Sequence, residues 1–277
     1  MPTVALPTGI DLYYESHGAG EPLVLLPSTA FASDVWHLEQ VNPLAERLNL
    51  IILDPRGCGR SSRPDRVYTI EQMAADVIAL LDHLDVRAAH VLGHSMGGRI
   101  ALTMALDHPG RVKSLILAAT GSGIATRAGE QCVVGLSHGM VMSLLERGFD
   151  GHQRHEIMEA STYFTPAFRA EHPDRVQALY DVVARSAARP PEYLRLVAAR
   201  QAWEATHRLG DVTVPTLVVV GSADTGGSNH VQQAEVLAAR IPNAVYKVLP
   251  GQTHGFFWEQ PAETNAWILD WVLRHAG

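Results

Sequence analysis

A serine with glycine two residues away on each side has the clearest catalytic potential in this chain. Ser95 lies at the centre of the sequence Gly-His-Ser-Met-Gly at residues 93–97, which fits the pattern G-x-S-x-G. The apolar run Ala89–Leu92 leads into it as an expected strand, and Arg99–Leu106 follows as an expected helix. A turn this sharp leaves no room for side chains two residues before and two residues after the serine, and it directs the hydroxyl toward the N–H groups of a helix N-terminus. Ser95 is therefore the predicted nucleophile, with His94 beside it as a packing residue.

A second serine fits the same pattern. Ser137 is the centre of Gly-Leu-Ser-His-Gly at residues 135–139. Only Val133 and Val134 precede it as a strand, and the surrounding stretch has helical periodicity. We interpret this second match as a break between helices and Ser137 as a residue without a catalytic role.

Short apolar runs bounded by Gly, Pro or Asp alternate with helical patterns through most of the chain. Continuous apolar strands are typical of a sheet that is buried on both faces, and such sheets are mostly parallel. The sequence therefore predicts an α/β fold, a mostly parallel twisted sheet with helices on both faces. The expected strands are Leu23–Leu26, Leu50–Leu53, His90–Leu92, Leu115–Ala118, Thr216–Val220 and Val245–Leu249, and the expected helices include Thr69–Leu84, Val231–Ile241 and Pro261–His275.

The alternation stops in the middle of the sequence. Residues 122–207 have helical periods and few strand signals, and His172–Ala188 and Pro190–Trp203 read as helices with proline near their starts. We expect a core formed by residues 1–121 and 208–277, with residues 122–207 inserted as a helical cap.

With these features the chain resembles the α/β-hydrolase fold family, over about residues 10–120 and 210–277. The segment Asp54–Ser61 is similar to the family's D-x-R-G-x-G-x-S loop, for which the resemblance implies a structural turn beside the site. Gly57 and Gly59 would also suit a dinucleotide-binding loop, but the third glycine is missing and no helix follows at once.

The resemblance implies a catalytic triad in the chain order nucleophile, acid, histidine. Asp224 follows the expected strand Thr216–Val220, and His254 lies in a turn similar to the family's G-x-x-H. Some relatives carry the acid one strand earlier, where this sequence has Ala118–Gly121 and no carboxylate. Asp224 and His254 are therefore the predicted acid and base.

The resemblance also implies two backbone N–H donors for the oxyanion of an acyl-transfer reaction. One belongs to Met96, directly after Ser95. Matching by position gives the second to Thr29. The family usually has His-Gly where this chain has Pro27 and Ser28, so the geometry of this loop departs from the family pattern.

Apolar and aromatic residues of the cap and of the turn after His254 are candidates for the pocket wall, although each would equally suit core packing. As a set they favour a small to medium, largely apolar substrate. These residues are Met140, Met142, Tyr163, Phe164, Trp203, Phe256 and Phe257.

The composition restricts the classes of partner. The chain has 277 residues, with 22 Lys+Arg, 29 Asp+Glu and a net charge of −7, and its basic residues are scattered, which argues against a nucleic-acid partner. Two cysteines fit a reducing cytoplasm, and neither a signal peptide nor an apolar run of spanning length is visible. His152 and His155 have no third ligand at suitable spacing, so neither a metal nor another cofactor is expected. A monomer and a homo-oligomer both remain open.

A serine at position 95, where dehalogenase-like and epoxide-hydrolase-like members carry aspartate, implies acyl chemistry. We predict a serine hydrolase of a carboxylic ester or lactone that forms an acyl-enzyme, similar to carboxylester, enol-lactone and meta-cleavage-product hydrolases. Alternatives are C–C bond hydrolysis of the meta-cleavage-product type, perhydrolase or hydroxynitrile lyase activity, and a slow or non-catalytic ligand-binding protein of this fold.

Overall fold

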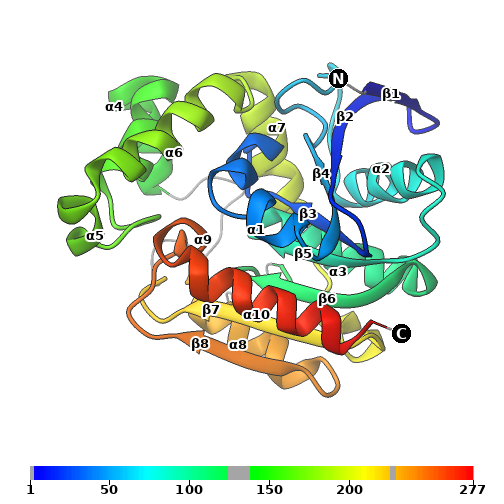
Figure 1. Cartoon of the computed structure of the whole chain (residues 1–277). Helices are drawn as coiled ribbons and strands as arrows, with labels where there is room; N and C mark the ends of the chain where they lie inside the picture. The colour runs from blue at the N-terminus through cyan, green and yellow to red at the C-terminus, as the bar shows by residue number, and fades with distance from the viewer. Residues whose placement is uncertain (1–2, 124–137, 225–228, 277) are drawn as a thin grey trace.

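The computed structural model describes residues 3–123, 138–224 and 229–276, and one eight-stranded sheet organises them (Figure 1). The strand order is β1-β2-β4-β3-β5-β6-β7-β8. Strands β3 to β8 pair in parallel, whereas β2 is antiparallel to both β1 and β4. The predicted mostly parallel sheet is confirmed, and two N-terminal strands extend it. The strands are β1 (Thr3–Leu6), β2 (Ile10–His17), β3 (Glu21–Leu26), β4 (Leu48–Leu53), β5 (Ala89–His94), β6 (Val112–Ala118), β7 (Thr216–Gly221) and β8 (Val245–Leu249).

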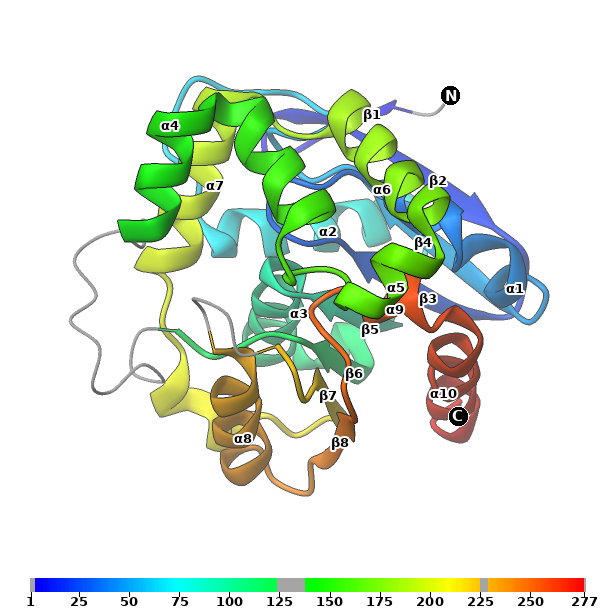
Figure 2. The same ribbon diagram turned by 90° about the vertical axis from the view of Figure 1, so that its left-hand side faces the viewer.

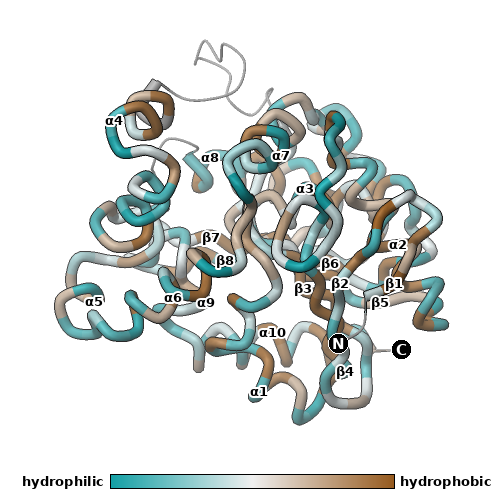
Figure 3. The backbone as a smooth tube through the Cα atoms, turned by 90° about the horizontal axis from the view of Figure 1, so that it is seen from above, coloured by the Kyte–Doolittle hydropathy of each residue, from teal (hydrophilic) through white to brown (hydrophobic). Residues whose placement is uncertain are grey.

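The central strands are buried on both faces, as their unbroken apolar sequences predict. In β3, Leu23 and Leu25 lie in one hydrophobic cluster, whereas Val24 and Leu26 lie in the other. Successive side chains of a strand point to opposite faces, so each central strand contributes to both layers of the core. Figure 3 shows the hydrophobic residues of these strands in the middle of the molecule.

Helices cover both faces of the sheet. Ile100 of α3 and Leu237 of α8 belong to the same hydrophobic cluster as Val24, whereas Leu44 of α1 and Val272 of α10 belong to the cluster on the opposite face. In the part of the chain that the structure describes, no helix combines the length and apolar character needed to cross a membrane. The helices of these layers are α1 (Val41–Ala45), α2 (Ile70–His83), α3 (Met96–Asp107), α8 (His230–Arg240) and α10 (Pro261–Arg274), with α9 (Phe256–Glu259) as a short turn.

The described elements between β6 and β7 are helical, and Figure 2 shows α4, α6 and α7 in the upper part of the view, with α5 lower down beside α9. Leu179 of α6 and Leu196 of α7 are fully buried, and each joins one of the two hydrophobic clusters. The division into core and cap stays a prediction. The helices are α4 (His138–Arg154), a π-helical turn (His155–Glu159), α5 (Pro166–Glu171), α6 (Pro173–Ser186), α7 (Pro190–Ala202) and a 3₁₀ turn (Thr206–Asp211).

The loop that begins at Asp54 is held by a buried carboxylate. Asp54 Oδ1 accepts hydrogen bonds from the backbone N–H and the hydroxyl of Ser33, at 2.8 and 2.6 Å. Its Oδ2 accepts from the backbone N–H and Nε of Arg60, both at 2.8 Å. A Cβ on Gly59, where φ is +49°, would lie 2.1 Å from Asp54 Oδ2, so only glycine fits there. These contacts tie the loop after β4 to the segment after β3.

Buried histidines predict how stability depends on pH. His90 of β5 is fully buried with its Nδ1 2.7 Å from Ser114 Oγ, and burial lowers its pKa to about 4. The unfolded chain, with a His pKa of about 6.5, takes up a proton that the folded protein excludes, so stability is lost as pH falls below 6.5. His90 alone should remove about 2 kcal/mol between pH 7.5 and pH 5.

Urea unfolding at pH 7.5 and pH 5 measures this loss. His90→Gln should reduce the loss in free energy of unfolding between pH 7.5 and pH 5 by about 2 kcal/mol. His207→Gln, which changes an exposed side chain, should leave this loss unchanged. An equal loss in wild type and His90→Gln would contradict the assignment.

Candidate active site

Ser95 lies in a strained turn between β5 and α3. Its backbone has φ 56° and ψ −115°, a conformation that is rare for a non-glycine residue. Ser95 N–H donates to Ala118 O at 2.9 Å, and Thr120 Oγ1 donates to Ser95 O at 2.6 Å. A Cβ on Gly93 would lie 2.2 Å from Gly97 O, which explains why glycine is needed in this turn.

The predicted acid and base are hydrogen-bonded to each other. Asp224 follows β7 and His254 follows β8, and Asp224 Oδ2 lies 2.7 Å from His254 Nδ1. Both side chains are buried. The two loops dock backbone to backbone, because Ala223 N–H donates to Gln252 O at 2.8 Å and a Cβ on Gly221 would lie 2.2 Å from that oxygen.

Asp224 is held ionised despite its burial. Burial alone would raise the pKa of its carboxyl group, but the attraction between the carboxylate and a protonated His254 or His230 ring and the hydrogen bonds from both rings outweigh this effect and lower the pKa far below its ordinary value. The carboxylate is therefore a permanent anion at neutral pH, as the orienting acid of a triad must be.

His94 links the turn at Ser95 to the predicted base, His254. Its ring lies 4.5 Å from the ring of His254, and its Nε2 lies 3.0 Å from His254 O, to which it donates. Burial lowers the pKa of His94 well below its ordinary value, so this residue is neutral. Because His94 directly precedes Ser95, these contacts place His254 beside the turn at Ser95.

The two predicted oxyanion donors lie on segments that touch. Met96 begins α3, where backbone N–H groups have no partner within the helix. A Cβ on Gly97 would lie 2.3 Å from Leu26 O and 2.8 Å from Pro27 O, so the start of α3 packs directly against the loop that carries Thr29.

A tight turn replaces the His-Gly of the family pattern. Phe31 N–H donates to Ser28 O at 3.1 Å, and Ala30 takes a left-handed conformation with φ 67°. The side chain of Arg200, from α7, reaches the same turn and donates from Nη1 to Thr29 Oγ1 at 3.3 Å. Thr29 is therefore held between the loop after β3 and a helix of the inserted segment.

This close packing predicts a large effect of a single methyl group. Gly97→Ala should move the loop that carries Thr29 and lower kcat/KM by about 10²–10³-fold, the usual effect of losing one oxyanion donor. Gly110→Ala is the matched control, because a Cβ there meets no atom within 4 Å. Ester kinetics and circular dichroism of both variants provide the test. A folded Gly97→Ala protein with wild-type kcat/KM would contradict the proposed contact.

The residues predicted as a pocket wall are distributed over several environments. The edge of the Tyr163 ring faces His254 at 5.5 Å, and the ring stacks on Phe31. Phe164, Phe256 and Phe257 are fully buried in the cluster around Leu23, Trp203 lies in the other cluster, and Met142 is exposed. Ser137 and the side chain of Met140 lie outside the described residues.

The contact of a second histidine with the Asp224 carboxylate was not predicted. His230 Nδ1 lies 3.1 Å from Asp224 Oδ1, and the His230 ring stacks on that of His254 at 4.5 Å. With 14 histidines in the chain, no sequence pattern singles it out.

Among the residues that the structure describes, two groups of side chains bring potential metal ligands together. Asp224, His230 and His254 form one, and Glu15, His17 and His37 the other, each with ligand atoms within 4.8 Å of one another. Hydrogen bonds already join the members of both groups.

His152 and His155, considered as a pair from the sequence, have different partners. Ser143 Oγ lies 3.0 Å from His152 Nδ1, and Glu159 Oε2 lies 2.9 Å from His155 Nδ1.

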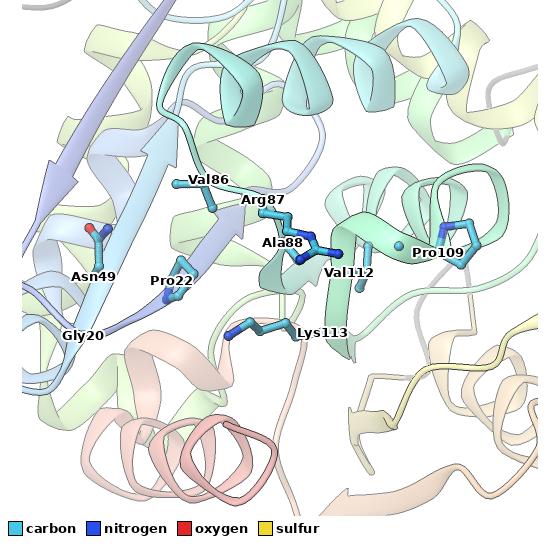
Figure 4. A pocket seen from close by; sticks show the side chains of 10 residues that line it. Gly20, Pro22, Asn49, Val86, Arg87, Ala88, Pro109, Val112 and Lys113 are labelled. Atoms are coloured by element: carbon cyan, nitrogen blue, oxygen red, sulfur yellow. The ribbon is translucent and has the colours of Figure 1, made fainter. Parts of the chain in front are cut away.

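A surface groove lies at the opposite end of the strands (Figure 4). Its residues flank the starts of β3 to β6, whereas Ser95, Asp224 and His254 follow the ends of their strands. The groove is therefore separate from the candidate active site. It is lined by Gly20, Pro22, Asn49, Val86, Arg87, Ala88, Pro109, Gly110, Val112 and Lys113.

This sheet, with a strained serine turn after β5, defines the class of protein. Residues 21–261 match a sequence family described as "alpha/beta hydrolase fold". The chain belongs to the α/β-hydrolase fold family.

Relatives within the family carry several activity names. The chain is 30% identical over 265 residues to "Putative carbamate hydrolase RutD" of Azorhizobium caulinodans, covering 94% of both chains. It is 28% identical to "3-oxoadipate enol-lactonase 2" of Acinetobacter baylyi, covering 92% of this chain and 91% of the relative. Among solved structures, the N-acyl homoserine lactone degrading enzyme Est816 aligns with a TM-score of 0.80 at 28% identity, over 96% of this chain and 98% of that one.

Proposed function

We propose that this protein is a serine hydrolase that cleaves a small to medium, largely apolar carboxylic ester or lactone through an acyl-enzyme. The observation that carries the proposal is the buried 2.7 Å contact between Asp224 and His254 beside the strained Ser95 turn. The names of the relatives, which include a lactonase and a lactone degrading enzyme, support the reaction class.

In the first half of the reaction, Ser95 Oγ attacks the substrate carbonyl carbon and its proton passes to Nε2 of His254. The ionised Asp224 holds Nδ1–H and stabilises the positive charge that forms on the ring. The backbone N–H groups of Met96 and Thr29 donate hydrogen bonds to the carbonyl oxygen and stabilise the negative charge that develops on it. The C–O bond then breaks, and the proton on Nε2 passes to the departing alkoxide.

In the second half, water attacks the acyl-enzyme. His254 Nε2 accepts the proton of the water, the tetrahedral intermediate collapses, and Ser95 Oγ leaves with that proton. For a lactone, the alcohol and the acid leave as one molecule.

The inserted segment, residues 122–207, is proposed as a cap over this site. It meets the site from two directions. His254 N–H donates to Thr162 O at 3.0 Å, and Arg200 donates to Thr29. A Cβ on Gly255 would lie 2.0 Å from Tyr163 O, so the base loop and the cap are in direct backbone contact. Such a cap can restrict both the substrate and the access of water.

A substrate panel on the purified protein tests the proposal. Nitrophenyl esters of increasing chain length, lactones, dienone acids and carbamates are compared by kcat/KM, with Ser95→Ala as the blank. Esters or lactones should give the highest values and an acyl group on Ser95. If dienone acids are preferred, the C–C hydrolase alternative is correct, and if no member turns over but ligands bind, the ligand-binding alternative is correct.

Carbamate hydrolysis is a second candidate because of one specific similarity, the relative from Azorhizobium named for that activity. The same attack by Ser95 on a carbamate carbonyl would give a carbamoyl-enzyme. A preference for carbamates in the panel would favour this candidate over the ester or lactone hydrolase.

A further inference from the structure

We propose that His230 is a positioning residue for the reaction: its ring N–H fixes the free oxygen of the triad carboxylate, so that Asp224 has one orientation and His254 one tautomer. The inference rests on the proposed function, because it assigns a role within the same triad. His230 does not touch the reacting atoms and acts only through Asp224 and His254.

Each oxygen of the Asp224 carboxylate contacts a different histidine. Oδ2 of Asp224 faces His254 Nδ1 at 2.7 Å, and Oδ1 faces His230 Nδ1 at 3.1 Å. An ionised carboxylate only accepts hydrogen bonds, so both histidines carry their proton on Nδ1. With a donor on each oxygen, Asp224 cannot rotate without losing a charge-assisted hydrogen bond in a buried site.

The position of His230 is fixed by the start of α8. It is the first residue of α8, and its side chain is only 13% exposed. Asn229, in a left-handed conformation with φ 41°, caps the helix by accepting a hydrogen bond from Gln232 N–H on its Oδ1 at 3.4 Å. The cap thus sets the direction of the first turn and brings the His230 ring onto the carboxylate.

The His254 ring has two imidazole neighbours. The His230 ring stacks on it and the His94 ring is tilted against it, and each ring centroid lies 4.5 Å from that of His254. During the reaction His254 becomes positively charged, and a second charge at this distance would oppose that step. Two neutral neighbours avoid the repulsion and still exclude water from the triad.

The groups that face His230 keep it neutral on balance. Burial lowers its pKa, and the nearby His254 and Arg200 act in the same direction, whereas Asp224 raises it. His94, the other imidazole neighbour of His254, is neutral as well. The N-terminal end of α8 also disfavours a positive charge on its first residue.

Two substitutions separate the hydrogen bond from the ring. His230→Asn keeps an N–H donor near the position of Nδ1 but removes the ring, whereas His230→Phe keeps a ring and removes the donor. His207→Phe, at an exposed site, controls for the substitution itself. Each protein is assayed for kcat and KM on the best ester across the pH range. Histidine N–H resonances are recorded by NMR.

We expect His230→Phe to lower kcat by about 10- to 100-fold with little change in KM, the range for losing a hydrogen bond to a charged group. Its activity should also require a higher pH, because a carboxylate with one donor fewer attracts the proton on the base more strongly. His230→Asn should stay within about threefold of wild type. The Nδ1–H resonance of His230 should disappear in His230→Phe and His230→Asn. The Nδ1–H resonances of His230 and His254 should both persist in His207→Phe.

Equal impairment of the Asn and Phe variants would overturn the proposal, as would wild-type kcat and pH profile in His230→Phe. These outcomes are distinguishable from failure of the proposed function. If Ser95→Ala kept activity, the serine mechanism would be wrong, while the NMR result would still show whether His230 donates to Asp224.

Discussion

Replacing Ser95 by alanine should lower kcat by about 10⁴–10⁶-fold, the loss expected when the nucleophile of a serine hydrolase is removed. The reason is chemical, because alanine has no oxygen to form the acyl-enzyme. Folding should be retained, since the neighbouring backbone contacts, Ser95 N–H to Ala118 O and Thr120 to Ser95 O, do not use the hydroxyl. Burst and steady-state kinetics with a nitrophenyl ester measure the effect.

The control for this prediction is Ser137→Ala, which alters the centre of the second G-x-S-x-G match. Its kcat should stay within a few-fold of wild type. A large loss in Ser137→Ala together with a small one in Ser95→Ala would reverse the assignment of the nucleophile.

Asp224→Asn should lower kcat by about 10⁴-fold. The amide has nearly the shape of the carboxylate but no charge, and its NH₂ can donate to His254 Nδ1. That would hold the ring in the tautomer with its proton on Nε2, which cannot accept the proton of Ser95. The lowered pKa of Asp224 indicates how strongly the native site depends on the charge.

Steady-state kinetics at neutral pH, with circular dichroism to confirm folding, measure this effect. Asp211→Asn, at an exposed position, is the matched control and should behave as wild type. Near-full activity in Asp224→Asn would require another acid.

The sheet was predictable because its central strands contain runs of consecutive apolar residues. Leu23 to Leu26 are all fully buried, and an unbroken run of this kind has few other solutions. The strand β2 was not predicted, because polar and charged residues such as Glu15 and His17 interrupt its pattern at the edge of the parallel strands. The formation of β2 depends on its pairing with β4, a strand distant in sequence, and the residues of β2 alone do not reveal that pairing.

The turn at Ser95 was predictable because backbone sterics leave a local trace in the sequence. Gly93 and Gly97 are required by contacts of about 2.2 Å that any Cβ would make, and this constraint is visible in the motif itself. The contact of His230 with Asp224 left no such trace, because no sequence pattern links these two residues. The same holds for the aromatic residues of the expected pocket. Phe256 and Phe257 pack into the core, whereas Tyr163 faces His254, and sequence alone does not separate these outcomes.

The central claim is that Ser95 is the nucleophile that His254 activates. Its most direct test is to treat the protein with a serine-directed fluorophosphonate and to locate the adduct by peptide mass spectrometry, in wild type and in His254→Ala. We expect one adduct, on the peptide that contains Ser95, formed at a rate that falls by orders of magnitude in His254→Ala. An adduct on another residue, or equal labelling rates in the two proteins, would contradict it.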